Sequence, residues 1–343
     1  MSRAVVLRAG PVSRRTTVRA LTVNAVLVLL VAGCALAALM LGDRPLTPGR
    51  VLAAFGPDAN ALDRLVVVEW RAPRAAAAVL FGACLGVSGA IFQSLTRNPL
   101  GSPDVVGLNT GAYTGVVTVL TLGGTGYAAQ AGGALLGGLG ATALVYLFAY
   151  RGGVHGFRFI VVGIAVSAML SSVNTWLTVK ADLDVAMRAA VWGAGGLNGV
   201  DWLPVTVSAA VAALLAPALP AAARWLRQLE LGDDTAGALG VRTEAAKAAL
   251  VVLGVALTAL VTAATGPVTF VALAAPQIAR RLTGHGGSVD LVGSALVGAL
   301  LVSGADLVGQ HAIPGTALPV GAVTVCLGGG YLLWLLVREV RRS

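Results

Sequence analysis

The sequence predicts an all-α, polytopic membrane protein with about ten transmembrane helices. Its 343 residues are 57% hydrophobic and only 11% charged, whereas soluble domains carry roughly 25% charged residues. Long apolar runs follow one another along the chain, separated by short segments that hold most of the charges. So few charges exclude a soluble surface, and so much apolar sequence excludes a disordered chain. We expect a single transmembrane domain over residues 1–343.

The first apolar run, residues 20–41, is long enough to cross a bilayer. Its length of about 22 residues exceeds the roughly 7–15 residues of a signal-peptide core. Ser13-Arg14-Arg15 resembles a twin-arginine signal and Val31–Cys34 resembles a lipoprotein cleavage site. The residues after Cys34 remain apolar, however, which is atypical of a processed lipoprotein. We therefore expect an uncleaved first span.

The distribution of basic residues gives the predicted topology. With the N-terminus in the cytoplasm and alternating spans, 17 of the 24 Lys and Arg residues face the cytoplasm and 7 face outward, as the positive-inside rule requires. Residues 1–19 then form a cytoplasmic tail, 42–74 an outer loop and 222–245 a cytoplasmic loop. The ten predicted spans are residues 20–41, 75–96, 105–122, 129–149, 159–179, 202–221, 246–265, 268–283, 289–309 and 318–337.

The sequence lacks motifs for catalysis, ATP binding or metal binding. There is no GxxxxGK[ST], no HExxH, and the three cysteines lie far apart in apolar runs. Asp306 is the only acid predicted near the bilayer interior, whereas a proton-driven carrier usually needs buried carboxylates. We expect no catalytic residue, metal site or cofactor, and an energy source supplied by another subunit.

One stripe of polar residues in the fifth span is a candidate lining. Ser167, Ser171, Asn174 and Thr178 follow the spacing i, i+4, i+7, i+11, which places them on one helical face. The stripe could line a translocation path, or its hydroxyls could bond to the preceding turn or a neighbouring helix. Glycines at helical spacing predict closely packed helices: Gly82/Gly86, Gly107/Gly111/Gly115 and Gly133/Gly137.

The predicted cytoplasmic loop contains signals for short helices. Glycines follow two short apolar segments, and Asp233 and Asp234 lie where a helix N-terminus would favour acids. A compact helical hairpin there would suit the docking of another protein, and an ordinary solvated loop is the alternative.

Five ordered stretches resemble the permease subunits of ABC importers for iron–siderophore and vitamin B12 chelates, the FecCD type. They are Arg71-Ala72-Pro73-Arg74, GACLGVSGAIFQSLTRNPLGSPD at 82–104, LELGDDTAGALGV at 229–241, GPVTFVALAAPQIARRLTG at 266–284 and LPVGAVT at 318–324. Within the family, VVVEWRAPR, NTWLTVKA and LGGGYL are most similar to the second permease subunit of ferric-enterobactin importers. The resemblance runs from about residue 65 to residue 340.

The sequence departs from the family pattern at four positions. Gln277 stands where the family usually has His, and Gly330 where a Pro usually precedes two aromatic residues. Gln310 and Ala317 replace an Arg and a Glu often seen in the last outer loop. The change at Gln310 affects one of the family's contacts to the binding protein.

The resemblance implies the type II ABC importer architecture, in a multi-pass permease of the bacterial inner membrane. It implies a second permease subunit, either a paralogue or a copy, with the path at their interface, and an import function for ferric siderophores of the catecholate kind. Vitamin B12 or haem chelates are the alternative cargo. An ATPase dimer would dock on the cytoplasmic loop, and a siderophore-binding protein outside. The residues implied are Arg71 and Arg74 for docking the binding protein; Gln93, Asn98, Leu100, Ser167, Ser171, Asn174 and Thr178 for the path and gate; and Leu231, Gly232, Asp233, Asp234, Ala236, Leu239 and Gly240 for ATPase coupling.

Overall fold

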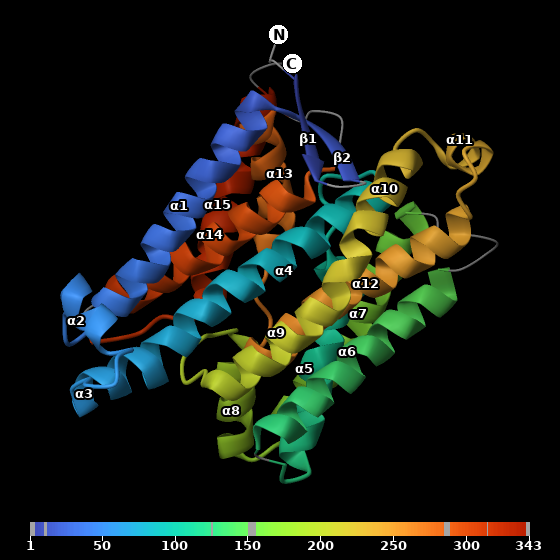
Figure 1. The fold of residues 1–343 in the computed structure, drawn as a ribbon. Helices are drawn as coiled ribbons and strands as arrows, with labels where there is room; N and C mark the ends of the chain where they lie inside the picture. Colours follow the sequence, from blue (N-terminus) through green and yellow to red (C-terminus); the bar gives the residue numbers. More distant parts are fainter. Residues whose placement is uncertain are drawn as a thin grey trace.

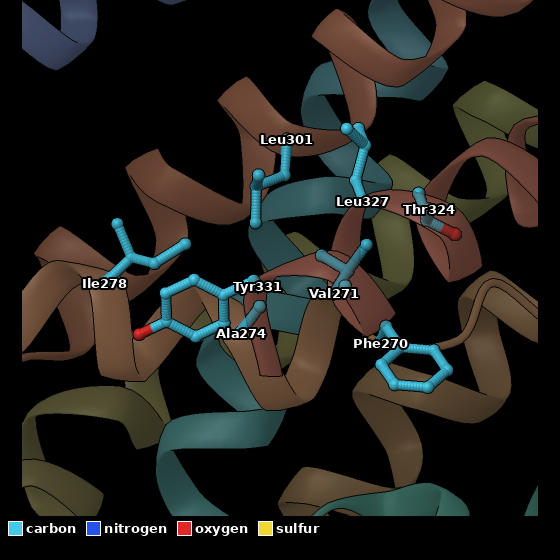
Figure 2. A pocket seen from close by; sticks show the side chains of 9 residues that line it. Phe270, Val271, Ala274, Ile278, Leu301, Thr324, Leu327 and Tyr331 are labelled. Carbon is cyan, nitrogen blue, oxygen red and sulfur yellow. The ribbon is translucent and has the colours of Figure 1, made fainter. Parts of the chain in front are cut away.

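The computed structural model describes residues 4–9, 12–124, 126–149, 156–284, 289–313 and 315–340, and it is almost entirely helical (Figure 1). A helix coincides with each of the ten predicted spans, which confirms the predicted fold class. These helices are α1 (Val18–Met40), α4 (Ala72–Thr96), α5 (Leu108–Thr121), α6 (Tyr127–Ala149), α7 (Gly156–Lys180), α9 (Trp202–Leu215), α12 (Thr243–Thr265), α13 (Val271–Thr283), α14 (Leu291–His311) and α15 (Val320–Val340).

Two of these helices are too short to cross a bilayer, whereas α9, which also has 14 residues, is part of a longer helical span over Trp202–Leu229. Seven helical segments in the described part of the chain are long and apolar enough to span a membrane. By contrast, α5 has 14 residues and α13 has 13. At ~1.5 Å per residue each covers roughly 20 Å of a hydrocarbon core about 30 Å thick. Non-helical backbone next to them therefore lies at membrane depth, where it has to be buried or to line a cavity.

Short elements occupy the connections, and among them the sequence predicted only the short helices of the 222–245 loop. A hairpin of β1 (Ala4–Ala9) and β2 (Val12–Thr17) precedes α1. The outer loop is largely helical, because α2 (Pro48–Ala53) lies in it and α3 (Ala61–Arg64) continues through the π-helical segment η1 (Leu65–Arg71) into α4. The remaining short elements are η2 (Pro103–Val106), α8 (Leu183–Gly193), η3 (Ala216–Ala218), α10 (Leu219–Leu229) and α11 (Asp233–Ala238).

Glycines allow close contact between two pairs of helices. A Cβ at Gly82 or Gly86 of α4 would overlap the backbone of α14, and a Cβ at Gly115 of α5 or Gly137 of α6 would overlap the facing helix. The prediction of closely packed glycine faces is confirmed at these positions. Gly107 has a different role, because it takes the left-handed conformation (φ 77°) in the turn before α5.

The short elements are sorted to the two ends of the bundle. Figure 1 shows the β1–β2 hairpin, α10 and α11 at one end, and α2, α3 and α8 at the other. This separation is what the predicted topology requires, since residues 1–19 and 222–245 are expected on one side of the membrane and 42–74 on the other.

Candidate functional site

An open cavity of about 770 Å³ lies between α5, α7 and the C-terminal end of α8, and most of its lining residues carry an amide or hydroxyl group. Three of the four residues in the predicted stripe on α7 line it: Ser171, Asn174 and Thr178. The other lining residues are Asn109, Thr110 and Tyr113 of α5, Thr175 and Val179 of α7, Ala190, Gly193 and Ala194 at α8, and Pro267 and Thr269 before α13. The non-helical backbone before α13 thus borders a cavity, as the short length of that helix requires.

Asn174 is the most buried polar residue on the cavity wall. Asn174 is only 6% exposed, and its Nδ2 donates a hydrogen bond to the Thr110 carbonyl at 3.2 Å. Within the described part of the chain its Oδ1 has no hydrogen-bond partner. A buried amide oxygen without a partner costs free energy of about 1–3 kcal/mol, so this atom favours an incoming water molecule or ligand group.

The fourth residue of the stripe lies elsewhere. Ser167 lies beside the turn at Gly107, since a Cβ added to Gly107 would be 3.1 Å from the Ser167 Oγ. Ser167 does not line the cavity. This local departure follows from the position of η2, which packs against α7 at that depth.

Two threonine stripes that also follow helical spacing serve mainly in packing. On α12, Thr258 donates to Ser88 Oγ at 2.8 Å and Thr262 donates to Asn109 Oδ1 at 3.0 Å, both between helices. On α5, Thr114 and Thr118 donate to the carbonyls one turn earlier. Thr110, the first residue of the α5 stripe, lines the cavity as well. Helical spacing alone therefore did not indicate which residues of these stripes line the cavity.

The turn after α4, with the predicted gate residues Asn98 and Leu100, is held by one of its own side chains and by one side chain of α13. Asn98 Oδ1 accepts a hydrogen bond from the Leu100 amide at 2.9 Å, and Gln277 of α13 donates to the Pro99 carbonyl at 2.7 Å. Gln277 therefore anchors the turn where the family usually has His. Leu100 itself is 53% exposed.

Gln93 fixes α4 to α13 one turn before the predicted gate residues. Its Nε2 donates to the Leu273 carbonyl at 2.8 Å, and its Oε1 accepts a hydrogen bond from Arg280 at 2.7 Å. Gln93 is only 2% exposed and does not line the cavity. Its contacts make it a bridge between two helices that flank the gate turn.

An ion-pair cluster joins the 222–245 loop to the predicted gate turn. Arg97, which ends α4 in the left-handed conformation, lies 2.9 Å from Asp233 and also donates to the Leu229 carbonyl at 3.0 Å. Lys247 of α12 lies 2.7 Å from the other oxygen of Asp233. The hydrogen bond from Lys247 is the main reason that the pKa of Asp233 lies below its ordinary value.

The helix α11 forms the predicted hairpin with α10, and it presents apolar side chains outward. Asp233 and Asp234 lie in its first turn, as predicted, and Ala236 is fully buried against the bundle. Leu231 and Leu239 on either side are 64% and 57% exposed. Glycines make both turns, with Gly232 at φ 107° and Gly240 at φ 84°.

The two arginines expected to form a docking site at the outer end are bonded within the chain. Arg71 donates to the carbonyls of Leu39, Met40 and Arg44 at 2.8–3.3 Å, and thereby caps the C-terminal end of α1. Arg74 forms an ion pair with Asp306, at 2.8 Å, and its side chain is only 18% exposed. The sequence predicted both arginines at the outer mouth. Their guanidinium groups are bonded within the chain, however, and do not form a free charged surface.

Comparison with known proteins places this architecture in a family. The chain matches the FecCD transport family over residues 26–338. The chain belongs to the FecCD transport family. It is 48% identical over 318 residues to the ferric enterobactin transport system permease protein FepG of Escherichia coli (strain K12), covering 92% of this chain and 96% of FepG. It is 34% identical over 345 residues to the achromobactin transport system permease protein CbrC of Dickeya dadantii (strain 3937), covering 99% of this chain and 98% of CbrC.

A solved structure supports the same assignment. The fold of this FecCD permease matches a metal-chelate type ABC transporter in an inward-facing conformation with a TM-score of 0.82 and 25% identity, over 93% of this chain and 99% of that one. The protein is therefore a multi-pass inner-membrane permease of an ABC importer, a transport subunit and not an enzyme.

Sequence reasoning missed part of the cavity wall of this FecCD permease. Asn109 and Tyr113 of α5 and the end of α8 were not predicted to take part. One signal in the sequence could have indicated α8: Leu183, Met187 and Val191 follow the spacing i, i+4, i+8 and mark an amphipathic helix.

Proposed function

We propose that this FecCD permease imports ferric siderophores of the catecholate, enterobactin-like kind into the cytoplasm. The cavity wall is the observation that carries this proposal, because its polar groups are amides and hydroxyls and none of the described lining residues is acidic. A neutral polar wall suits an anionic ferric chelate, which carboxylates would repel. The extensive similarity to FepG supports the catecholate class.

The orientation and the second permease subunit form part of this proposal. We place residues 1–19 and 222–245 in the cytoplasm and residues 42–74 outside, with one domain over residues 1–343. Helix α7 carries three of the cavity residues, and it also has an exposed face on which Ile164 is 60% and Trp176 is 62% exposed. A second permease, either a paralogue or a copy, packed on this face would close the cavity into a path.

The coupling route follows the ion-pair cluster. An ATPase dimer would dock on α11, where Leu231 and Leu239 expose apolar surface beside the buried Ala236. Movement of α11 would reach the gate turn directly, because Asp233 is bonded to Arg97, the residue before Asn98. Asp234, Gly232 and Gly240 complete the docking surface.

On the outer side, we propose that a siderophore-binding protein docks on the 42–74 segment. Arg71 and Arg74 would support this surface rather than contact the partner, since their guanidinium groups already bond inside the chain. Exposed residues of the same segment, including Arg64 and Glu69, remain available for charged contacts.

Uptake of radiolabelled iron by a strain that lacks this gene tests the proposal. The expected result is a loss of uptake from ferric enterobactin that the wild-type gene restores and Asn174→Leu restores poorly, because the apolar side chain removes the buried amide from the path. Uptake of a ferric hydroxamate, haem and vitamin B12 serves as the control. If the deletion strain loses uptake of one of these compounds and keeps uptake of ferric enterobactin, that compound is the cargo. Uptake that persists without any ATPase would indicate a secondary carrier.

A further inference from the structure

A second pocket, of about 410 Å³, lies between α10 and the first turn of α12. Its walls include Arg224, Trp225 and Gln228 of α10 and Arg242 and Ala245 at the start of α12. We call it the basic pocket, because it contains two arginines and none of the described residues that line it is acidic. Both arginines are exposed and neither has an ion pair among the described contacts.

The depth of the basic pocket places it at the membrane surface. Trp202 begins α9, and Arg224 follows 22 residues later on the helix that continues through η3 into α10. At ~1.5 Å per residue this separation is roughly 33 Å, slightly more than the ~30 Å hydrocarbon core. If Trp202 lies at one membrane interface, Arg224 and Trp225 lie among the lipid headgroups of the other.

An apolar track leads from the pocket toward the bilayer centre. Val207 and Leu214, which are 49% and 79% exposed, lie 18 and 11 residues before Trp225 and therefore on about the same helical face. On the facing helix, Val252 is 68% exposed and lies two turns after Ala245. Because α9 packs against α12, we expect these exposed apolar side chains to face lipid below the pocket.

We propose that the basic pocket binds the phosphate of an anionic phospholipid of the cytoplasmic leaflet, with the acyl chains along the apolar track. Guanidinium groups donate paired hydrogen bonds to phosphate oxygens, and Trp is favoured at this depth. A carboxylate of the partner ATPase would meet the same charges, but the exposed apolar side chains of α9 and α12 favour a lipid. Only the choice of leaflet rests on the proposed orientation.

The proposed lipid would also contact the coupling loop. Leu239 and Gly240, which follow α11, form part of the pocket wall together with Arg242. A bound headgroup would therefore stabilise the C-terminal end of α11 against α12, next to the surface where the ATPase is proposed to dock. Anionic lipid is then expected to increase the fraction of permease molecules in which α11 is correctly placed for docking.

Native mass spectrometry of the full chain in its complex tests the site directly, with phosphatidylglycerol and phosphatidylcholine as the probes. We expect the wild type to retain phosphatidylglycerol in preference to phosphatidylcholine. In Arg224→Gln with Arg242→Gln, we expect the apparent affinity for phosphatidylglycerol to fall roughly 30-fold, from the loss of two surface charges. The matched control is Arg227→Gln, an exposed arginine of α10 outside the pocket, which is expected to leave the preference unchanged.

Three results would overturn the assignment: a wild type without any preference for phosphatidylglycerol, a double variant that retains the preference, or an Arg227→Gln variant that loses it equally. If the double variant keeps its lipid but no longer co-purifies with the ATPase, the pocket is a protein-docking site instead. The lipid measurement needs no siderophore, so its failure is distinct from a failure of the proposed transport function. The single variant Arg242→Gln provides the same test if the double variant assembles poorly.

Discussion

Arg74 of α4 holds the carboxylate of Asp306 of α14 through hydrogen bonds of 2.8 and 3.0 Å, although 232 residues separate the two in the sequence. The Asp306 side chain is 2% exposed, and Gln310 donates a further hydrogen bond to it at 2.7 Å. Gln310 therefore completes this cluster at the position where the family often has Arg. The outer ends of the two central helices are fixed to each other by a buried charge pair.

Breaking this pair from one side is expected to destabilise the protein strongly. Arg74→Gln leaves the buried carboxylate without its cation, which costs about 3–5 kcal/mol. Replacing both partners with apolar residues, Arg74→Met with Asp306→Leu, is expected to cost less than either single change, because no buried charge remains unpaired. Thermal unfolding of the purified permease measures both, with exposed Arg64→Gln as the control. Additive losses in the double variant would contradict this account.

The cavity predicts a pattern of reactivity toward water-soluble thiol reagents. After Cys34, Cys84 and Cys326 are replaced by Ala, a cysteine at Ser171 or Thr178 is expected to react, since both positions line the cavity. A cysteine at Val166, which is 8% exposed and packs in the core with Leu108, is expected to remain unlabelled. Equal labelling at all three positions would show that the α7 stripe does not face water.

Removing the charge of Asp233 is expected to separate ATP hydrolysis from transport. Asp233→Asn weakens the contacts to exposed Arg97 and to Lys247, whose side chain is only 11% exposed. Because Asp233 itself is 45% exposed, we expect uptake per ATP hydrolysed to fall roughly twofold to tenfold. The control is Asp184→Asn, an exposed acid in the first turn of α8 that belongs neither to this cluster nor to the proposed docking surface. Proteoliposomes with the reconstituted complex give both rates. An unchanged ratio in Asp233→Asn would remove this residue from the coupling route.

The pH dependence of the same cluster follows from the lowered pKa of Asp233. A carboxyl whose pKa is lower in the folded state stabilises that state above the unfolded pKa, about 3.9. The contribution is lost as pH falls through the folded pKa. The difference in melting temperature between wild type and Asp233→Asn should therefore be constant from about pH 8 to pH 5 and decrease below about pH 4. A difference that already declines between pH 7 and pH 6 would point to another titrating group.

Two glycines on α6 provide a test of helix packing. A Cβ at Gly137 would overlap the backbone of α5, whereas a Cβ at Gly140 meets nothing within 4 Å. Gly137→Ala is expected to cost about 1–3 kcal/mol of stability through overpacking. Gly140→Ala is expected to be neutral or stabilising by up to about 1 kcal/mol, because Ala is the better helix former. Equal melting temperatures for the two variants would mean that the α5–α6 contact is looser than the structure shows.

Much of the cytoplasmic side could be predicted because its signals are local. Helix caps, glycine turns and acids at a helix N-terminus depend on a few neighbouring residues, and α11 with Asp233 and Asp234 in its first turn follows them. The partners of Asp233 are not local. Arg97 is 136 residues away in the sequence, and only the approach of α4 to the loop brings it within hydrogen-bond distance.

The sequence by itself determined that ten helices form, roughly where each lies, and which segments share a side of the membrane. Lipid demands a long apolar run with internally satisfied hydrogen bonds for each span, and both requirements can be read residue by residue. Only the tertiary structure decided which faces meet. Three of the four stripe residues on α7 line a cavity, while the equally periodic Thr258 and Thr262 of α12 are buried, and Arg74 pairs with Asp306 rather than facing outward. The physical reason is that lipid and neighbouring helices are both apolar, so the hydrophobic pattern of a span does not distinguish the face it turns to lipid from the face it turns to protein.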